Sequence, residues 1–553
     1  MTRPLLLTAL AVISFGCGSS KSSSGDGGGM GGNKTTGTGG SSATGGSGAT
    51  GGSSATGGSS ATGGSSATGG ATGTGGSSSD QSVLERNKHP NRDGNFLQPT
   101  LTKAAAATLA ADTTFNSGAT FTGDVYASLL YMQNGPNGKG AFFTVTDSNT
   151  VYALDETTGA TIWSKGIGSA PSKTGVSCGF INPIGSISTP VIDANARVIY
   201  VAGATGTSSI MDHQIHALSV DDGMEKSGWP VSALKATSGN LTFTPAPQNQ
   251  RSALSLVNGT LYVAYGGHDG DCGPYHGWVI GVDTSNPAMM GAWATAGQGE
   301  GIWAPGGMAS DGNGVFALTS NSTTGTTTHM DSEEAVRITG LGTLADSFYS
   351  SDWQAMDSSD ADLGANNPLY VEVPGATPSK MVVAISKNGH LYLLDAGNLG
   401  GKGGQKVDFQ VAGAAGNEGM LIHTVPASYT TAQGLHVIFS TNSSANCPSG
   451  SPGGAVVMSV LIPAGAPPKP SVVWCASASN TPGPISTTTD GTSNVVVWFI
   501  NNGKLTGVDG DTGASVFTST NSCANVQHWT SPIAVNGRIV VAGGGNLCSW
   551  SPH

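Results

Sequence analysis

Four side chains of the types that bind metals or transfer protons lie within one short segment of this 553-residue chain. His268, Asp269, Asp271 and His276 fall within nine residues. Carboxylate oxygens and imidazole nitrogens are ligands for Ca²⁺ and for transition metals. Their spacing matches no calcium loop in full. The segment is therefore either a metal loop or a turn in which Asp and His hydrogen-bond their own backbone.

A second acidic segment contains Asp357, Asp360 and Asp362. Three carboxylates this close repel one another unless they are separated, solvated or bridged by a cation. Ca²⁺ is the candidate cation, and a solvated acidic loop is the alternative. A lone histidine, His423, precedes a predicted strand and is more typical of a structural residue.

No sequence motif identifies a catalytic residue. The chain has no Gly-x-Ser-x-Gly and no His-Glu-x-x-His motif, which weakens hydrolase readings without excluding a site built from distant loops. No catalytic residue is predicted.

The elements that would position these segments begin after an export signal. Residues 1–16 contain one basic side chain and an apolar run from Leu5 to Phe15, the length of a signal-peptide core and too short to span a bilayer. Cys17 follows Ser-Phe-Gly, which resembles the lipobox of bacterial lipoproteins. We expect Cys17 to carry the lipid, and a secreted protein without lipid is the alternative.

Residues 17–86 are predicted to form a disordered tether. From Gly18 to Asp80 the composition is almost entirely Gly, Ser, Thr and Ala, with a Gly-Ser-Ser-Ala-Thr-Gly unit in tandem. Such a segment has too few apolar side chains to offset the entropy of folding, and about 60 residues would span roughly 45 Å.

A repeated frame indicates the fold of residues 87–553. The first copy, residues 151–163, reads Val-Tyr-Ala-Leu-Asp-Glu-Thr-Thr-Gly-Ala-Thr-Ile-Trp: a strand, a Thr-Gly turn and a second strand. Its aspartate position recurs after 64, 64, 112 and 114 residues. Eight segments, six of them opened by a proline after a small or polar residue, run in step with it as innermost strands.

Long repeats of short strands with Gly, Asn and Asp turns predict an all-β fold, a single β-propeller of four-stranded blades. Eight blades are expected and seven are the fallback; almost no helix is expected. The last blade lacks an outer strand, and an N-terminal strand around 113–122 is the expected donor, which would close the ring.

The frame resembles the repeat of PQQ-type quinoprotein alcohol dehydrogenases and of the propeller lipoprotein of the outer-membrane barrel assembly machinery. Further stretches, including 258–268, 273–279, 301–307 and 387–395, resemble a bacterial group of PQQ-binding-like propellers. The resemblance is specific for fold, because the repeated residues form turns and packing contacts, and one fold hosts unrelated activities.

The resemblance also implies what a quinone enzyme would need. Such enzymes hold PQQ flat on a tryptophan, commonly cover it with a disulfide between adjacent cysteines, chelate it through Ca²⁺ and use an aspartate base. This chain has no adjacent cysteines and no Cys-x-x-Cys-His haem motif. We therefore expect that the protein binds no PQQ and predict no cofactor, with bound Ca²⁺ as the alternative.

Six further cysteines are disulfide candidates, because an even number in an exported chain favours disulfides, and no pair has the Cys-x-x-Cys spacing of a zinc site. Cys523 with Cys548 is favoured, since both lie in the final blade, and Cys447 with Cys475 comes next. Cys178 and Cys272 are the remaining candidates. Free buried cysteines are the alternative.

The net charge of the chain limits the classes of binding partner that we expect. The net charge is −12 and no basic cluster exists, so nucleic acid is excluded as an expected partner.

We expect a non-catalytic binding or scaffold propeller of the bacterial envelope, held at the outer membrane on its periplasmic or cell-surface side by the N-terminal lipid. Its partner would be an envelope protein or a glycan. The alternative is a quinone-dependent dehydrogenase or a polysaccharide-acting enzyme, which would show carboxylates converging on the central channel, whereas a binding propeller would lack perturbed titratable groups.

Overall fold

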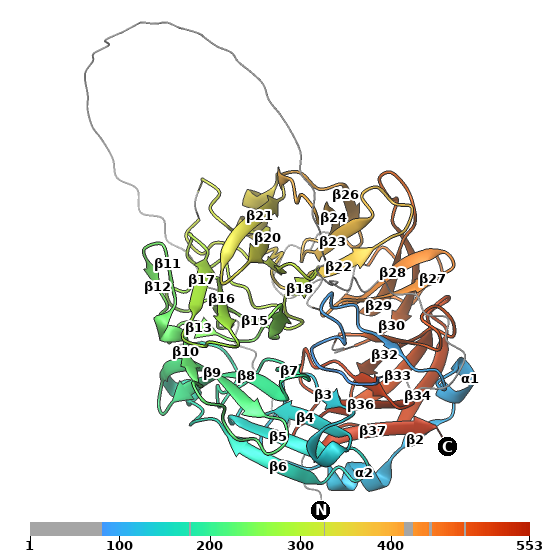
Figure 1. The fold of residues 1–553 in the computed structure, drawn as a ribbon. Coiled ribbons are helices and arrows are strands. Elements are labelled where there is room, and N and C mark those ends of the chain that lie inside the picture. Colours follow the sequence, from blue (N-terminus) through green and yellow to red (C-terminus); the bar gives the residue numbers. More distant parts are fainter. Residues whose placement is uncertain are drawn as a thin grey trace, which may run out of the picture. The chain divides into compact units, whose positions relative to one another are not determined.

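Antiparallel strands follow one another around a ring of eight blades from Leu130 onward (Figure 1). The computed structural model describes residues 80–175, 178–325, 327–413, 424–441, 445–479 and 483–552. Cys17, the tether up to residue 79 and His423 lie outside these residues. The eight blades confirm the predicted propeller.

Each of the first four blades runs outward from a short inner strand. Their bounds are β3 (Leu130–Met132), β4 (Ala141–Val145), β5 (Thr150–Asp155) and β6 (Thr161–Gly166) in blade 1; β7 (Val191–Asp193), β8 (Val198–Gly206), β9 (Ile210–Ser219) and β10 (Val231–Ser232) in blade 2; β14 (Ser255–Val257), β15 (Thr260–Gly267), β16 (Trp278–Asp283) and β17 (Met290–Ala294) in blade 3; and β18 (Ala309–Ser310), β19 (Val315–Leu318), β20 (Glu334–Thr339) and β21 (Thr343–Tyr349) in blade 4. Additional short strands are β13 (Gln248–Asn249), which pairs with β15, β25 (Gly401–Lys402), which pairs with β21, and the hairpin of β11 (Thr237–Ser238) and β12 (Leu241–Thr242).

Blades 5 to 8 repeat this pattern. Their bounds are β22 (Leu369–Glu372), β23 (Lys380–Ile385), β24 (His390–Asp395) and β26 (Val407–Gln410) in blade 5; β27 (Ala427–Thr431), β28 (Gly434–Thr441), β29 (Val456–Ile462) and β30 (Ser471–Ser477) in blade 6; β31 (Ile485–Thr488), β32 (Val496–Asn501), β33 (Lys504–Asp509) and β34 (Ser515–Ser522) in blade 7; and β35 (Ile533–Val535), β36 (Arg538–Ala542), β37 (Leu547–Pro552) and β2 (Leu109–Ala111) in blade 8.

The middle strands are apolar because both of their faces are covered. All five residues of β4, Ala-Phe-Phe-Thr-Val, are buried, whereas the outer strand β6 of the same blade is mostly exposed. A strand with a neighbouring blade on each side cannot alternate between apolar and polar residues. The core therefore lies between adjacent blades.

The repeated Asp-x-x-Thr-Gly frame forms a turn, and the tryptophan that follows it contacts the next blade. The Asp155 carboxylate accepts hydrogen bonds from the backbone N–H groups of Thr157 and Thr158, and Gly159 takes the left-handed φ of 71° that the turn requires. The Trp163 indole then donates to the carbonyl of Val220 on blade 2, 2.9 Å away. These residues build the ring, which is why their repetition carries no functional signal.

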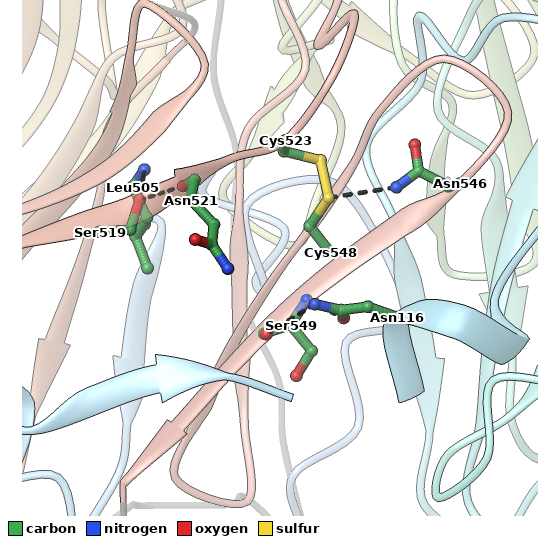
Figure 2. Close-up of a disulfide and its surroundings, with 8 residues drawn as sticks. All are labelled: Asn116, Leu505, Ser519, Asn521, Cys523, Asn546, Cys548 and Ser549. Atoms are coloured by element: carbon green, nitrogen blue, oxygen red, sulfur yellow. Dashed lines mark hydrogen bonds between the residues drawn. A yellow bond between two sulfur atoms is a disulfide. The ribbon is translucent and has the colours of Figure 1, made fainter. Parts of the chain in front are cut away.

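The ring closes between the two ends of the chain. Strand β2 pairs antiparallel with β37, with Ala111 opposite Trp550, so the donor strand is 109–111. The expected donor at 113–122 is wrong, because the Asp112 side chain caps helix α2 (Thr113–Gly118) by accepting from the N–H of Phe115. Figure 2 shows Asn116 of this helix bound to Ser549 of β37.

Three disulfides reinforce the blades: Cys523–Cys548, Cys447–Cys475 and Cys178–Cys272. The first, shown in Figure 2, joins the end of blade 7 to β37 and lies beside the closure of the ring. The first two are the pairs that the sequence analysis favoured. The third connects residues 94 positions apart in the sequence.

In the described parts of the chain, helix is confined to short segments. Besides α2 these are α1 (Lys103–Ala106), α3 (Trp353–Ser359) and the single 3₁₀ turns η1 (Pro136–Gly138), η2 (Lys173–Gly175) and η3 (Ala233–Lys235). Among the described residues, none of these helices is long and apolar enough to cross a membrane.

Candidate functional site

The chain fills its own central channel with the segment Val83 to Gln98, which we call the strap. In Figure 1 this blue segment crosses the centre of the ring before the chain enters blade 1. Strand β1 (Asn95–Leu97) is part of it and pairs in parallel with the inner strand β31. The sequence analysis assigned residues 83–86 to the tether, whereas they pack inside the propeller.

The strap contacts every blade. Its backbone or side-chain groups hydrogen-bond, in blade order, to Tyr131, Ile192, Leu254, Ser310, Tyr370, Ser428, Ser486 and Ala534. In most of these contacts a strap carbonyl accepts from an inner-strand N–H, such as the 2.8 Å bond from Ser310 to Pro90. Inner strands have no blade neighbour on their channel side, so the strap satisfies backbone groups that would otherwise need water.

Two buried arginines anchor the strap. Arg92 is completely buried, pairs with Glu85 at 2.9 Å and donates to the carbonyls of Met308 and Leu254. Burial raises the pKa of Glu85 and lowers that of Arg92, while each charge opposes the shift of the other. Arg86 has only neutral acceptors, including the Trp529 carbonyl and Ser531 Oγ, and burial lowers its pKa to about 9.

One mouth of the channel holds a cavity of about 630 Å³, which we call the strap cavity. Strap residues His89, Asn91 and Asp93 form one wall, and the inner strands of blades 4, 5 and 6 form the others, with Tyr370 and Glu372 among their residues. Its volume lies within the range of about 300–1,000 Å³ typical of small-molecule sites.

The polar groups of the strap cavity are paired but accessible. His89 Nδ1 lies 2.8 Å from Asp93, and the Tyr370 hydroxyl donates to Glu372 at 2.9 Å. In the part of the chain that the structure describes, no hydroxyl or thiol hydrogen-bonds the other ring nitrogen of His89. The pair therefore lacks the nucleophile of a hydrolytic triad.

Aromatic side chains gather at the opposite mouth, which we call the Arg251 mouth. Arg251, Trp303 and Trp529 lie on the connections that lead into inner strands, whereas the strap cavity borders the turn after an inner strand, so the two sites are at opposite ends. The Arg251 guanidinium lies over the Trp529 ring at 4.2 Å and 6.0 Å from that of Trp303. Phe180 is 47% exposed and lies 6.2 Å from Trp529.

The predicted loop 268–276 borders the Arg251 mouth but does not assemble as a metal loop. Asp271 accepts from the Tyr275 hydroxyl at 2.5 Å, and His276 Nδ1 lies 2.9 Å from the Thr295 carbonyl. His268 is buried and Asp269 is exposed, and both line a small pocket beside Arg251. Their side chains turn to separate partners.

The second acidic segment is bridged by a lysine. Lys387 Nζ lies 2.5 Å from Asp362 and 3.2 Å from Asp360, while Asp357 accepts from the N–H of Ser322 and the hydroxyl of Ser332. Two of the three carboxylates thus pair with an ammonium group, and the third accepts from neutral donors. Across the described residues, no three His, Cys, Asp or Glu side chains are placed to hold a metal ion.

Carboxyls with raised pKa on blades 3 to 5 form a cluster, of which the sequence analysis named only Asp357 and Asp360. Burial is the largest cause of the raised pKa in each of them, and it raises the pKa of Glu300 and of Glu334 to about 8. The members are Glu300, Asp331, Glu333, Glu334, Asp357 and Asp360. The expectation that a binding propeller lacks perturbed groups is therefore not met.

Two members of the cluster, Glu300 and Glu333, hold loops together. Glu300 accepts from the N–H of Gly297 at 2.9 Å, and Glu333 accepts from the N–H of Leu363 at 2.5 Å. Both side chains are completely buried, and neither belongs to the walls of the strap cavity or of the pocket beside Arg251. Their raised pKa values follow from structural burial, which also perturbs pKa outside active sites.

Comparison with solved structures identifies the fold. A quinohemoprotein alcohol dehydrogenase from Pseudomonas putida is similar with a TM-score of 0.62 at 13% identity, over 85% of this chain and 80% of that chain. The enzyme from Comamonas testosteroni gives 0.59 at 13% identity, over 85% and 80% of the chains. A europium-containing methanol dehydrogenase gives 0.53 at 15%, over 85% and 91%. No family model and no curated protein matches the sequence.

The predicted resemblance to PQQ-type propellers therefore holds for the fold. The residues of the Arg251 mouth do not fit the quinone itself. The Arg251 guanidinium lies over the Trp529 ring at 4.2 Å, so that face of the indole is not open for a quinone to stack on. The nearby disulfide joins Cys178 to Cys272 and is not a lid of adjacent cysteines.

Proposed function

We propose that this chain is a non-catalytic binding propeller of the bacterial envelope that takes a neutral glycan in the strap cavity. The observation that carries the proposal is the strap, which contacts all eight blades and forms one wall of a cavity of about 630 Å³, a volume suited to a small ligand. The three disulfides are compatible with an exported protein.

The lining of the strap cavity favours a polyhydroxylated ligand. Carboxylates at Asp93 and Glu372 and the amide of Asn91 are planar groups that accept or donate hydrogen bonds to hydroxyls. Tyr370, which is 9% exposed, adds part of an aromatic ring to the lining for the C–H groups of a sugar. Acidic walls disfavour an anionic glycan here, so a neutral one is favoured.

Binding rather than catalysis is favoured by where the reactive groups lie. Glu300 and Glu333, whose pKa values are raised by burial, accept hydrogen bonds from loop N–H groups and line neither the strap cavity nor the pocket beside Arg251, and the strap occupies the channel. The N-terminal tether would hold the propeller at the outer membrane through lipid on Cys17, free to reach a surface or periplasmic glycan.

A blocking variant tests the site. Thr430 lies exposed on β27 and lines the cavity, so Thr430→Trp should fill the site without disturbing the core. Saturation-transfer NMR of the full-length protein with maltotriose, cellotriose and triacetylchitotriose should detect at least one bound trisaccharide, recovered unchanged. Binding should disappear in Thr430→Trp.

Thr518→Trp is the matched control, because Thr518 is exposed on the outer strand β34 of blade 7. It should bind the trisaccharide like the unmodified protein. Absence of any trisaccharide binding, or binding that persists in Thr430→Trp, would overturn the proposed site. Recovery of cleaved or oxidised sugar would overturn the non-catalytic function.

A further inference from the structure

Arg251 has hydrogen-bonding capacity that the protein does not use. Its Nε donates to the Trp303 carbonyl at 2.9 Å, and its guanidinium is held over the Trp529 ring. Among the described residues, no acceptor hydrogen-bonds either Nη atom. Asp269 and Asp362 attract the charge through space without forming an ion pair, and Asp362 is bound to Lys387. Two parallel donors therefore remain free at the mouth.

A buried histidine beside Arg251 is also unsatisfied. His268 is 3% exposed, and its Nε2 has no hydrogen-bond partner in the described structure. Its side chain lines the same small pocket as Arg251 and Asn249. Leaving a buried polar atom unpaired costs about 1–3 kcal/mol, so this nitrogen, in a side chain that lines the pocket, would gain from a ligand or water that completes it.

The size of this pocket limits what enters it. The cavity volume is only about 10 Å³, comparable to the space of a single water molecule. A carboxylate oxygen fits there and a sugar ring does not. Outside the pocket, the exposed ring of Phe180 lies beside Trp529 and His528 and offers an apolar platform for such a ring.

We propose that the Arg251 mouth binds an acidic sugar, a uronate residue of a polysaccharide, with its carboxylate on Arg251 and His268 and its ring on Phe180. The planar guanidinium matches a carboxylate with two parallel hydrogen bonds. Exposed Asp269 at the rim accepts hydrogen bonds from sugar hydroxyls. The Cys178–Cys272 disulfide fixes the two loops that supply Phe180 and His268. This site shares no residue with the strap cavity.

Calorimetric titration of the full-length, oxidised protein tests the site, with trigalacturonate as probe and galactotriose as its neutral counterpart. Trigalacturonate should bind, and galactotriose should bind at least about tenfold more weakly, since each tenfold loss corresponds to one lost charge-assisted contact of about 1.4 kcal/mol. Arg251→Met should reduce trigalacturonate affinity by at least about tenfold, and Arg251→Lys should reduce it less.

Three further variants separate the site from general effects. Phe180→Ala, at an exposed position, should weaken binding without changing the melting temperature. Arg197→Met removes a surface arginine elsewhere and should leave binding intact, as should Thr430→Trp in the strap cavity. Equal affinity for the two trisaccharides, or unchanged binding in both Arg251→Met and Phe180→Ala, would overturn the proposal. Loss of binding in Thr430→Trp would place the acidic sugar in the strap cavity and would also overturn it.

Discussion

Glu300 should make the protein less stable as the pH rises from 6.5 to 8. Its side chain is completely buried, and burial raises its pKa from the ordinary value of 4.5 to about 8. The carboxyl is therefore protonated in the folded protein over a range where the unfolded chain is ionised. The folded state binds the extra proton, so its contribution to stability is complete below pH 4.5 and is lost as the pH rises toward 8.

The size of the effect follows from these two values. Between pH 6.5 and pH 8 one such group removes about 1.5 kcal/mol from the free energy of unfolding. The window starts at 6.5 because three buried histidines, His213, His268 and His436, have pKa values lowered by burial to about 4. Their contributions are lost as the pH falls from 6.5 to 4, and they would oppose the effect of Glu300 below that window.

The variant Glu300→Gln keeps an acceptor for the Gly297 N–H and cannot ionise. Urea unfolding followed by tryptophan fluorescence at pH 6.5, 7, 7.5 and 8 should show a smaller loss of stability with pH, by about 1.5 kcal/mol over the window. Glu334→Gln should have a similar effect, because burial also raises the pKa of Glu334 to about 8. Glu372→Gln, at an exposed carboxylate, is the control. Parallel pH dependences in the unmodified protein and in Glu300→Gln would refute the reasoning.

Four other predictions address the strap, the disulfides, the anchor and the cofactor. Arg92→Met leaves Glu85 buried without its partner and should lower the free energy of unfolding by about 3–5 kcal/mol, measured by urea titration; Arg197→Met at the surface should change it little. Cys523→Ala with Cys548→Ala removes a cross-link over 25 residues and should cost about 3 kcal/mol, and an unchanged melting curve would contradict this. Cys17→Ser should release the protein from the membrane fraction, whereas full retention would argue against lipidation. With PQQ and Ca²⁺ added, the protein should neither retain the quinone in equilibrium dialysis nor reduce a dye with alcohols or sugars, and PQQ-dependent dye reduction would disprove the non-enzymatic function.

The candidate site was only partly predictable. The turn frame at Asp155 and Gly159 involves contacts two to four residues apart, and such local chemistry can be read from the order of residues. The lysine that bridges Asp360 and Asp362 lies more than 20 positions along the chain, and the indole that covers Arg251 lies 278 positions away. No spacing rule relates such residues. The end of the low-complexity composition at Asp80, followed by charged residues, was the one signal of the strap.

The sequence by itself determined the blades of this protein. Short strands, Gly and Asp turns and proline-led inner strands recur, and each repeat stabilises itself against its neighbour through contacts that the repeat encodes. Only the tertiary structure decided what fills and closes the ring. Segment 83–98 has no periodicity and gains its place from bonds such as that from Arg86 to Ser531, 445 residues apart. Because inner-strand backbone groups need partners wherever the ring brings them together, the position of the strap depends on the closed ring as well as on its own arginines, and the order of residues does not reveal it.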